Sequence, residues 1–289
     1  MLNVCLYKPG ADNNFSNDKN GMYKEVKLLE QAFIKNGCKP DIFNFDYGKN
    51  VSYHVSFVFN CMKDNFRNNF KHIAGLRQKS YKMVYILTDL RLECPEESKI
   101  LFDRIATQQP GGNYNGIPEL ALLNYEHDFC YDKSVLFSYG GGVRERGRDF
   151  KEYLEPFISN EQAFILTKNN EFDNRLAIDE YYELLNKTKY SIVIMDGSYY
   201  ENNFITWRYF ENIAHNVVTF VDDKCDPSYY LLPNNHFLRV KSYNEMVEKI
   251  GFMENNEMLF SACLDFQKRK ITKEKIEGRY SLRHLLKGL

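Results

Sequence analysis

The stretch YSIVIMDGSYYENNFITWRYFENIAHNVVTFVDD, residues 190–223, holds the pattern that decides the fold class. It begins and ends with short apolar and β-branched runs, 190–196 and 217–223, which have the length of buried strands. Between them lie an Asn-rich loop and an aromatic, apolar segment with helical character. A strand, a helix and a second strand in this order predict two parallel strands in one sheet.

The same alternation extends over most of the chain. Further strand-like runs are LNVCLY (2–7), PDIFNF (40–45), SYHVSFVFN (52–60), YKMVYILTDL (81–90), SVLFSY (134–139) and QAFILT (162–167). Helices are predicted over 21–37, from about Arg144, and over 177–187. In the first of these helices Val26, Leu29 and Phe33 recur at helical spacing, and Gly37 stands where a helix ends.

These runs form two successive blocks that meet near residues 127–133. We therefore predict an α/β protein with two Rossmann-like lobes and a cleft between them. The expected domains are 1–130, 131–265 and a basic terminal helix over 266–289 that packs back on the first lobe.

The composition is that of an ordinary folded protein. The 289 residues are 44% hydrophobic and 27% charged, and the formal net charge of −1 does not by itself indicate a polyanionic partner. Seven scattered cysteines without a CxxC pair predict neither a disulfide framework nor a zinc site. The histidines have no metal-ligand spacing, and nothing indicates a Ser or Cys nucleophile. Without a leader-like or membrane-spanning segment, we expect a cytoplasmic protein.

The stretch FSYGGGVRERGRDF, residues 137–150, combines three glycines with Arg144, Arg146 and Arg148. Glycines let the backbone approach a phosphate, helix N-termini offer amides, and arginines offer bidentate charge. The stretch is neither a Walker A loop nor a GxGxxG fingerprint. A Gly-rich turn before a solvated helix remains the alternative.

Arg208 and Glu211 lie three residues apart on the predicted helix of the opening stretch. This spacing places them on one face, where an Arg could hold a diphosphate and a Glu could accept hydrogen bonds from a ribose diol. An exposed intrahelical ion pair is the alternative.

Three carboxylates are weaker candidates. Asp89 follows the apolar run of YILTDLRL (85–92), where a general base or a turn-capping Asp would stand. Glu25 and Glu126 alone are more typical of surface carboxylates.

Taken together and in this order, these segments resemble the DNA β-glucosyltransferases of T-even phages, two-lobed GT-B enzymes that transfer glucose from UDP-glucose to 5-hydroxymethylcytosine in duplex DNA. The resemblance implies that Asp89 is the catalytic base and that Glu25 and Glu126 are further active-site carboxylates. The family's UDP-glucose contacts fall on Gly141, Gly142, Val143, Arg144, Arg148, Tyr200, Arg208 and Glu211. It also implies a phage protein that acts in the infected bacterial host and protects DNA from host restriction.

Two departures concern the acceptor. Gly142 and Val143 replace a serine and an aromatic residue of the family, and the segment between Asp89 and Glu126 is shorter. A T-even relative of this general length, the β-glucosyl-HMC-α-glucosyltransferase, adds a second glucose to give gentiobiosyl-hydroxymethylcytosine. The departures favour a second β-linked glucose on α-glucosyl-hydroxymethylcytosine, with direct β-glucosylation of hydroxymethylcytosine as the alternative.

We expect a monomer that binds UDP-glucose and modified duplex DNA but no membrane, with no protein metal site and with Mg²⁺ or Mn²⁺ stimulation left open. Candidate DNA contacts are Arg67, Lys71, Arg77, Lys79 and Lys82 and, in the terminal stretch, Lys268, Arg269 and Lys270. A solvated helical face explains these charges equally well. A nucleotide-sugar epimerase and a non-catalytic DNA-binding protein remain more distant alternatives.

Overall fold

The computed structural model describes residues 2–9, 24–42, 51–61, 63–87, 96–107, 133–142, 147–157, 160–168, 176, 178–195, 206–226, 229, 231–276, 282–286 and 288. The chain divides into two compact units. The first unit comprises Met1–Asn124 and Lys275–Leu289, and the second comprises Tyr125–Glu274.

The first unit contains a parallel five-stranded sheet with the order β2-β1-β3-β4-β5. The strands are β1 (Val4–Tyr7), β2 (Asp41–Ile42), β3 (Tyr53–Phe59), β4 (Ser80–Leu87) and β5 (Arg104–Thr107). The central strands β1 and β3 are almost entirely buried, as expected where helices cover both faces of a parallel sheet. The first four strands confirm the predicted runs, and β5 is additional.

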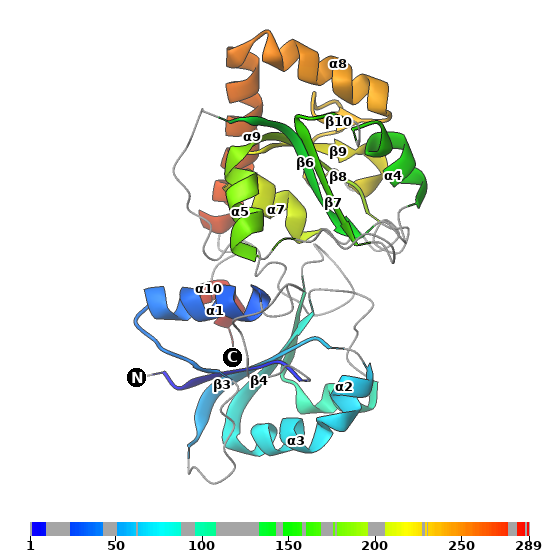
Figure 1. The fold of residues 1–289 in the computed structure, drawn as a ribbon. Coiled ribbons are helices and arrows are strands. Elements are labelled where there is room, and N and C mark those ends of the chain that lie inside the picture. The colour runs from blue at the N-terminus through cyan, green and yellow to red at the C-terminus, as the bar shows by residue number, and fades with distance from the viewer. Residues whose placement is uncertain are drawn as a thin grey trace. The chain divides into compact units, whose positions relative to one another are not determined.

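Helices cover both faces of this sheet (Figure 1). They are α1 (Lys24–Lys35), α2 (Lys63–Asn68), α3 (Phe70–Lys79) and α10 (Leu282–Leu286), with a 3₁₀ turn at Glu96–Leu101. α1 and α10 lie on one face, whereas α2 and α3 lie on the other. α10 is joined to the sheet by a hydrogen bond from Arg104 Nη1 to Leu285 O of 3.2 Å. As predicted, Gly37 stands just past the end of the first helix, where its φ of 74° allows Cys38 N to bond Phe33 O at 2.9 Å.

The second unit contains a parallel five-stranded sheet with the order β10-β9-β8-β6-β7. The strands are β6 (Val135–Gly142), β7 (Ala163–Lys168), β8 (Thr188–Val193), β9 (Val218–Asp222) and β10 (Arg239–Val240). The opening β–α–β stretch forms β8, α7 and β9 as predicted, and β9 is buried along its whole length.

The helices of the second unit are α4 (Gly147–Tyr153), α5 (Ile178–Lys187), α7 (Trp207–Ala214), α8 (Tyr243–Glu254) and α9 (Glu257–Ile276), with 3₁₀ turns at Glu155–Phe157 and Asp223–Cys225. α5 and α7 lie on one face of the sheet and α4 lies on the other (Figure 1). α9 continues through residue 266, where the sequence predicts a separate terminal segment.

The two sheets share one topology. In each, the first strand of the unit lies between the second and the third, and the fourth and fifth follow outward. This is the 2-1-3-4-5 order of doubly wound folds, so the prediction of two Rossmann-like lobes in an α/β protein is confirmed. Within the described ranges, every helix is too short or too polar to cross a lipid bilayer.

Candidate functional site

The strand order of the second unit places its ligand-binding position between β6 and β8. In sheets of this topology, ligands bind beyond the carboxyl ends of the strands where the chain order reverses, which here is between the first and third strands of the unit. β6 ends in Gly140, Gly141 and Gly142, and α7 is the next described helix after β8. The two segments singled out in the sequence therefore flank the same position.

The glycines belong to the strand itself rather than to a turn. Gly140, Gly141 and Gly142 pair in register with Leu166, Thr167 and Lys168 of β7. A Cβ atom on Gly141 would overlap Arg208 Nη2 and would lie 2.9 Å from both Arg208 Cζ and Tyr139 Oη. The missing side chain therefore gives the guanidinium room to lie against the backbone.

Arg208 contacts two tyrosines, and one of its nitrogens has no hydrogen-bond acceptor among the described residues. Its Cζ lies 4.8 Å from the centre of the Tyr139 ring, a cation–π contact, and it hydrogen-bonds the hydroxyl of Tyr181. Arg208 Nη1 is buried and makes no hydrogen bond within the part of the chain that the structure describes. Because a buried guanidinium N–H without an acceptor is costly, this atom indicates where an anionic oxygen would bind.

Glu211 lies one turn after Arg208 and is buried, with 3% of its surface exposed. Its Oε1 accepts a hydrogen bond of 3.4 Å from the hydroxyl of Tyr182 on α5. The Tyr182 ring stacks on His215 at 4.8 Å, and His215 Nδ1 lies 2.8 Å from Asn186 Oδ1. A buried carboxylate in polar surroundings can accept hydrogen bonds from ligand hydroxyl groups.

The start of α7 adds backbone donors to the side chains. The side chain of its N-cap residue, Thr206, makes no capping hydrogen bond. A helix N-terminus carries N–H groups and a partial positive charge, both of which favour phosphate oxygens. One turn later, the buried side-chain amide of Asn212 makes no hydrogen bond to any described residue. The polar side of α7 therefore has more hydrogen-bonding capacity than the described residues use.

Lys133 fixes the opposite ends of the two helices that carry the site. Its buried Nζ donates to Leu185 O and Asn186 O at the end of α5, at 3.3 and 3.2 Å, and to Thr188 O at the start of β8, at 2.7 Å. It also donates to His215 O at the end of α7, at 3.0 Å. One ammonium group thus neutralises the carbonyl ends of both helices and holds them together.

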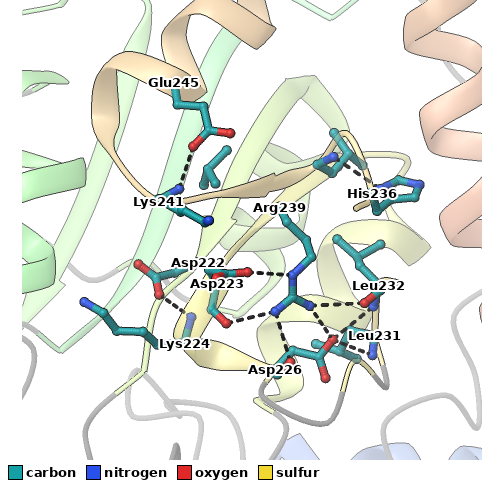
Figure 2. Close-up of polar contacts among 12 residues, drawn as sticks. Asp222, Asp223, Lys224, Asp226, Leu231, Leu232, His236, Arg239, Lys241 and Glu245 are labelled. Carbon is teal, nitrogen blue, oxygen red and sulfur yellow. Dashed lines mark hydrogen bonds and ion pairs between the residues drawn. The ribbon is translucent and has the colours of Figure 1, made fainter. Parts of the chain in front are cut away.

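A buried ion-pair network shapes the segment after β9 (Figure 2). Arg239 Nε donates to Asp223 Oδ1 at 2.9 Å, and Nη1 donates to Asp226 Oδ2 at 3.0 Å. Nη1 also bonds Leu232 O at 3.1 Å, and Nη2 bonds Asp223 O and Asp226 O at 2.8 and 3.1 Å. Asp226 Oδ2 accepts further bonds from Leu231 N and Leu232 N. Arg239 is therefore fully used in structure and is no candidate for ligand binding.

Next to this network, burial raises the pKa of Asp222, and the negative charge of Asp149 adds to the effect. Hydrogen bonds from Lys224 N and the Tyr153 hydroxyl oppose it. Asp222 is the last residue of β9, and Asp149 lies in the first turn of α4.

Of the predicted UDP-glucose contacts, some lie among the described residues and some do not. The structure brings together Gly141 and Arg208 directly, and Glu211 lies one turn further along α7. Gly142 is the last residue of β6, and Arg148 lies in the first turn of α4. The other predicted UDP-glucose contacts, Val143, Arg144 and Tyr200, lie outside the described residues.

Of the three predicted carboxylates, the structure describes the backbone position of one. Glu25 lies in the first turn of α1. Asp89 and Glu126 are outside the described residues, although Asp89 comes two residues after the last residue of β4.

The predicted DNA contacts of the first unit differ in their availability. Arg67 and Lys71 are exposed, and Lys79 is half-buried. Arg77 Nη1 pairs with Asp103 Oδ2 at 2.8 Å, and Lys82 Nζ lies 3.7 Å from Asp103 Oδ1. Asp103 thus partly neutralises two of the five candidates.

The terminal candidates lie on α9 of the second unit. Arg269 is exposed, while Lys268 and Lys270 are half-buried. Burial lowers the pKa of Lys268, and Asp265 opposes the shift.

Three tyrosines of the site were not predicted from the sequence. Tyr139 stands directly before the glycines, and Tyr181 and Tyr182 are consecutive on α5. The signal available in the sequence was the pair of aromatic residues with polar tips in a helix next to the predicted nucleotide segments.

Within the described ranges, no group of three or more His, Cys, Asp or Glu side chains could hold a metal ion.

No protein-family model matches this chain, and no curated protein sequence matches it. Solved structures do. T4 phage BGT in complex with UDP and Mn²⁺ has a TM-score of 0.71 and 18% identity over 96% of this chain and 97% of its own. A structure of the DNA-modifying enzyme β-glucosyltransferase, with and without uridine diphosphoglucose, has a TM-score of 0.70 and 19% identity over the same shares. A mutant of T4 phage BGT in complex with UDP-glucose has a TM-score of 0.72 and 17% identity over 96% and 97%.

The likeness covers both units of the chain. This chain has the GT-B fold. At this level of identity the likeness concerns the fold, and the chemistry must be argued from the residues of the site.

Proposed function

We propose that this chain is an inverting glucosyltransferase that moves glucose from UDP-glucose onto modified cytosine in phage DNA. The observation that carries the proposal is Arg208, which lies against Gly141 at the end of β6 and whose buried Nη1 has no hydrogen-bond partner among the described residues. The solved structures with the same fold, described with UDP and UDP-glucose, support the choice of nucleotide.

In this proposal the second unit binds the donor. Arg208 and the N-terminus of α7 neutralise the diphosphate, and Glu211 holds the ribose hydroxyls. Arg144 and Arg148 add charge from the segment that follows β6, together with the backbone of Gly141, Gly142 and Val143. Tyr200 completes the donor contacts.

The reaction needs one base and a stabilised leaving group. Asp89 accepts the proton of an acceptor primary hydroxyl, whose oxygen forms a bond to the anomeric carbon of glucose as the bond to the diphosphate oxygen breaks. Attack from the face opposite the leaving group inverts the α-linked donor to a β-glucoside, and UDP leaves with its charge held by the arginines. Glu25 and Glu126 orient the glucose and the acceptor near Asp89.

The first unit contributes the acceptor side. Arg67 and Lys71 are exposed and suited to contact DNA phosphates, whereas Arg77 and Lys82 are partly neutralised by Asp103. We infer that the acceptor is α-glucosyl-hydroxymethylcytosine, which receives a second glucose to give the gentiobiosyl product. The shorter segment between Asp89 and Glu126 supports this choice over hydroxymethylcytosine itself.

One of the solved structures is a complex with UDP and Mn²⁺. The described residues of this chain offer no cluster of three or more protein ligands for such an ion, and the steps above involve none. A transfer assay with and without MnCl₂ or MgCl₂ determines whether a divalent ion stimulates the reaction.

A transfer assay tests the proposal. The protein is incubated with UDP-glucose and duplexes that carry cytosine, hydroxymethylcytosine or α-glucosyl-hydroxymethylcytosine, and the nucleosides are analysed by mass spectrometry. We expect a hexose added to the glucosylated base and released by a β-glucosidase. Addition to hydroxymethylcytosine alone would select direct glucosylation. No addition to any duplex, with UDP still bound, would contradict the proposed activity.

Asp89→Asn provides the matched variant in this assay. It should abolish transfer and leave UDP affinity nearly unchanged, because the base acts on the acceptor. Full turnover by this variant would contradict the assignment of Asp89. Sugar-nucleotide conversion without DNA would instead identify an epimerase, and DNA binding without turnover would identify a binding protein.

A further inference from the structure

Two consecutive tyrosines of α5 contact the two side chains that α7 presents to the site. The rings of Tyr181 and Tyr182 are 6.0 Å apart and inclined by 40°. Neighbouring residues on a helix point about 100° apart, so each ring can reach a different partner. Tyr181 hydrogen-bonds Arg208, and Tyr182 donates to Glu211 at 3.4 Å.

Tyr181 fits against the glycine-ended strand β6. A Cβ atom on Gly140 would lie 2.9 Å from Tyr181 Cε2 and 3.5 Å from its hydroxyl oxygen. The next glycine, Gly141, leaves the same kind of space for the Arg208 guanidinium. Gly140 thus leaves space for Tyr181, and Gly141 leaves space for Arg208, at the same end of the strand.

These contacts limit the orientations that Arg208 can adopt. The Tyr139 ring lies against the guanidinium, the Gly141 backbone approaches it, and the Tyr181 oxygen accepts one of its N–H groups. Burial raises the pKa of the Tyr181 hydroxyl, and the Arg208 charge opposes the rise without cancelling it. Tyr181 therefore stays neutral near pH 7 and leaves the positive charge of Arg208 available to a ligand.

Tyr182 contacts His215 through its ring and Glu211 through its hydroxyl group. Its ring stacks on His215 with an interplanar angle of 28°. His215 is held in turn through Nδ1 to Asn186 Oδ1 at 2.8 Å. The hydroxyl of Tyr182 is thus presented to Glu211 by a rigid ring, although the hydrogen bond of 3.4 Å is long.

We propose that Tyr181 and Tyr182 are positioning residues of a nucleoside diphosphate site, with Tyr181 orienting Arg208 toward the diphosphate and Tyr182 orienting Glu211 toward the ribose diol. The inference rests on the proposed function, because it assigns the ligand groups that the two α7 side chains would meet. It extends that function because each of the two α7 side chains would be oriented by the hydroxyl group of a different tyrosine on α5.

Removal of one hydroxyl at a time tests this division. Tyr181→Phe and Tyr182→Phe keep the rings and their packing, and calorimetry measures binding of UDP, uridine and the 2′-deoxy analogue of UDP. Tyr190→Phe is the matched control, because Tyr190 is a buried tyrosine of β8 whose hydroxyl donates to Glu254 at 2.8 Å away from the site.

We expect Tyr181→Phe to weaken UDP binding about tenfold and uridine binding far less, since a hydrogen bond to a charged group is lost beside the diphosphate. Tyr182→Phe should weaken UDP and uridine alike, by about threefold, because its hydrogen bond is long. Its effect should shrink with the 2′-deoxy analogue. The control should bind all three ligands like the wild type.

The outcomes separate this inference from the function on which it rests. Wild-type affinity for every ligand in both variants would overturn the inference. Equal losses of UDP and uridine in Tyr181→Phe would also overturn it, because they would indicate a general structural effect. A wild-type protein that does not bind UDP would instead overturn the proposed function.

Discussion

The two units have the same strand order, yet their reversal points carry different chemistry. In the second unit the position between β6 and β8 combines a glycine-ended strand, a guanidinium whose buried Nη1 has no hydrogen-bond partner among the described residues, and a buried carboxylate. In the first unit the corresponding position lies between β1 and β3. Topology thus offers two equivalent positions, and side chains determine what each can bind.

Two hydrogen bonds at the first reversal point join residues of the same unit. Tyr7 Oη donates to Asn69 Oδ1 at 3.0 Å, and Asn60 N bonds Ile86 O at 2.8 Å. Cys61 is buried, which raises its pKa to about 12 although Lys8 opposes the rise. The described ends of β1 and β3 carry no glycine, unlike the end of β6. The comparison explains why we assign the nucleotide to the second unit and the acceptor to the first.

The largest expected effect concerns the stability of the second unit alone. Arg239→Ala leaves the carboxylate of Asp226, only 2% exposed, without its ion pair, and should destabilise this unit by about 3–5 kcal/mol. Trp207, the single tryptophan, lies on α7 of the same unit, so its fluorescence during urea denaturation reports the loss.

The control for this substitution is Arg269→Ala, at an exposed position of α9. The urea concentration at its unfolding midpoint, followed by Trp207 fluorescence, should stay near the wild-type value. An unchanged midpoint in Arg239→Ala would show that the network does not hold the second unit.

Arg208→Ala should have the largest effect on ligand binding. The loss of the guanidinium removes charge-assisted hydrogen bonds to the diphosphate, and UDP affinity should fall about a hundredfold by calorimetry. Lys8→Met, at the reversal point of the first unit, should leave UDP affinity unchanged. The opposite result, with UDP lost in the Lys8 variant only, would reverse the assignment of the two units.

Gly141→Ala should have an intermediate effect. The added methyl group overlaps Arg208 Nη2 and would lie 2.9 Å from Tyr139 Oη, so the guanidinium is displaced from its position and UDP affinity should fall about tenfold. Gly251→Ala on α8 is the control, since its Cβ would meet nothing within 4 Å. Equal UDP affinity in both variants would show that the close approach of Arg208 does not matter.

The smallest effect concerns pH. Burial, Lys249 and Arg239 lower the pKa of His236 below its ordinary value of 6.5. As pH falls through 6.5, the unfolded chain therefore binds a proton that the folded protein does not, and stability decreases. The stabilising contribution is complete above pH 6.5.

His236→Gln should reduce this acid loss by less than about 1 kcal/mol. Thermal midpoints followed through Trp207 between about pH 7.5 and about pH 5.5 provide the measurement. His72→Gln, at an exposed position of the first unit, is the control. A pH dependence that is identical in the wild type and in His236→Gln would contradict the role of this side chain.

The fold was largely predictable because strands of a covered parallel sheet are continuous apolar runs. β8 and β9 are examples, with burial along nearly their whole lengths. The edge strand β10 escaped prediction because it has two residues, one of them the charged Arg239. Its burial depends on carboxylates and carbonyls that come together only in the folded chain.

The site was predictable only in part for a similar reason. Helical spacing places Arg208 and Glu211 near each other on α7, and both lie there. Their tyrosine partners come from β6 and α5, far away in the chain, and no local pattern pairs them. A Gly-rich turn was one alternative for the glycines, whereas sheet pairing makes them the end of a strand.

Hydrogen–deuterium exchange with and without UDP tests the central claim most directly, since it compares both reversal points in one experiment. We expect UDP to protect the end of β6 and the start of α7, with no change in β1 and β3. Protection of β1 and β3 without protection of β6 and α7 would contradict the claim that the second unit holds the nucleotide.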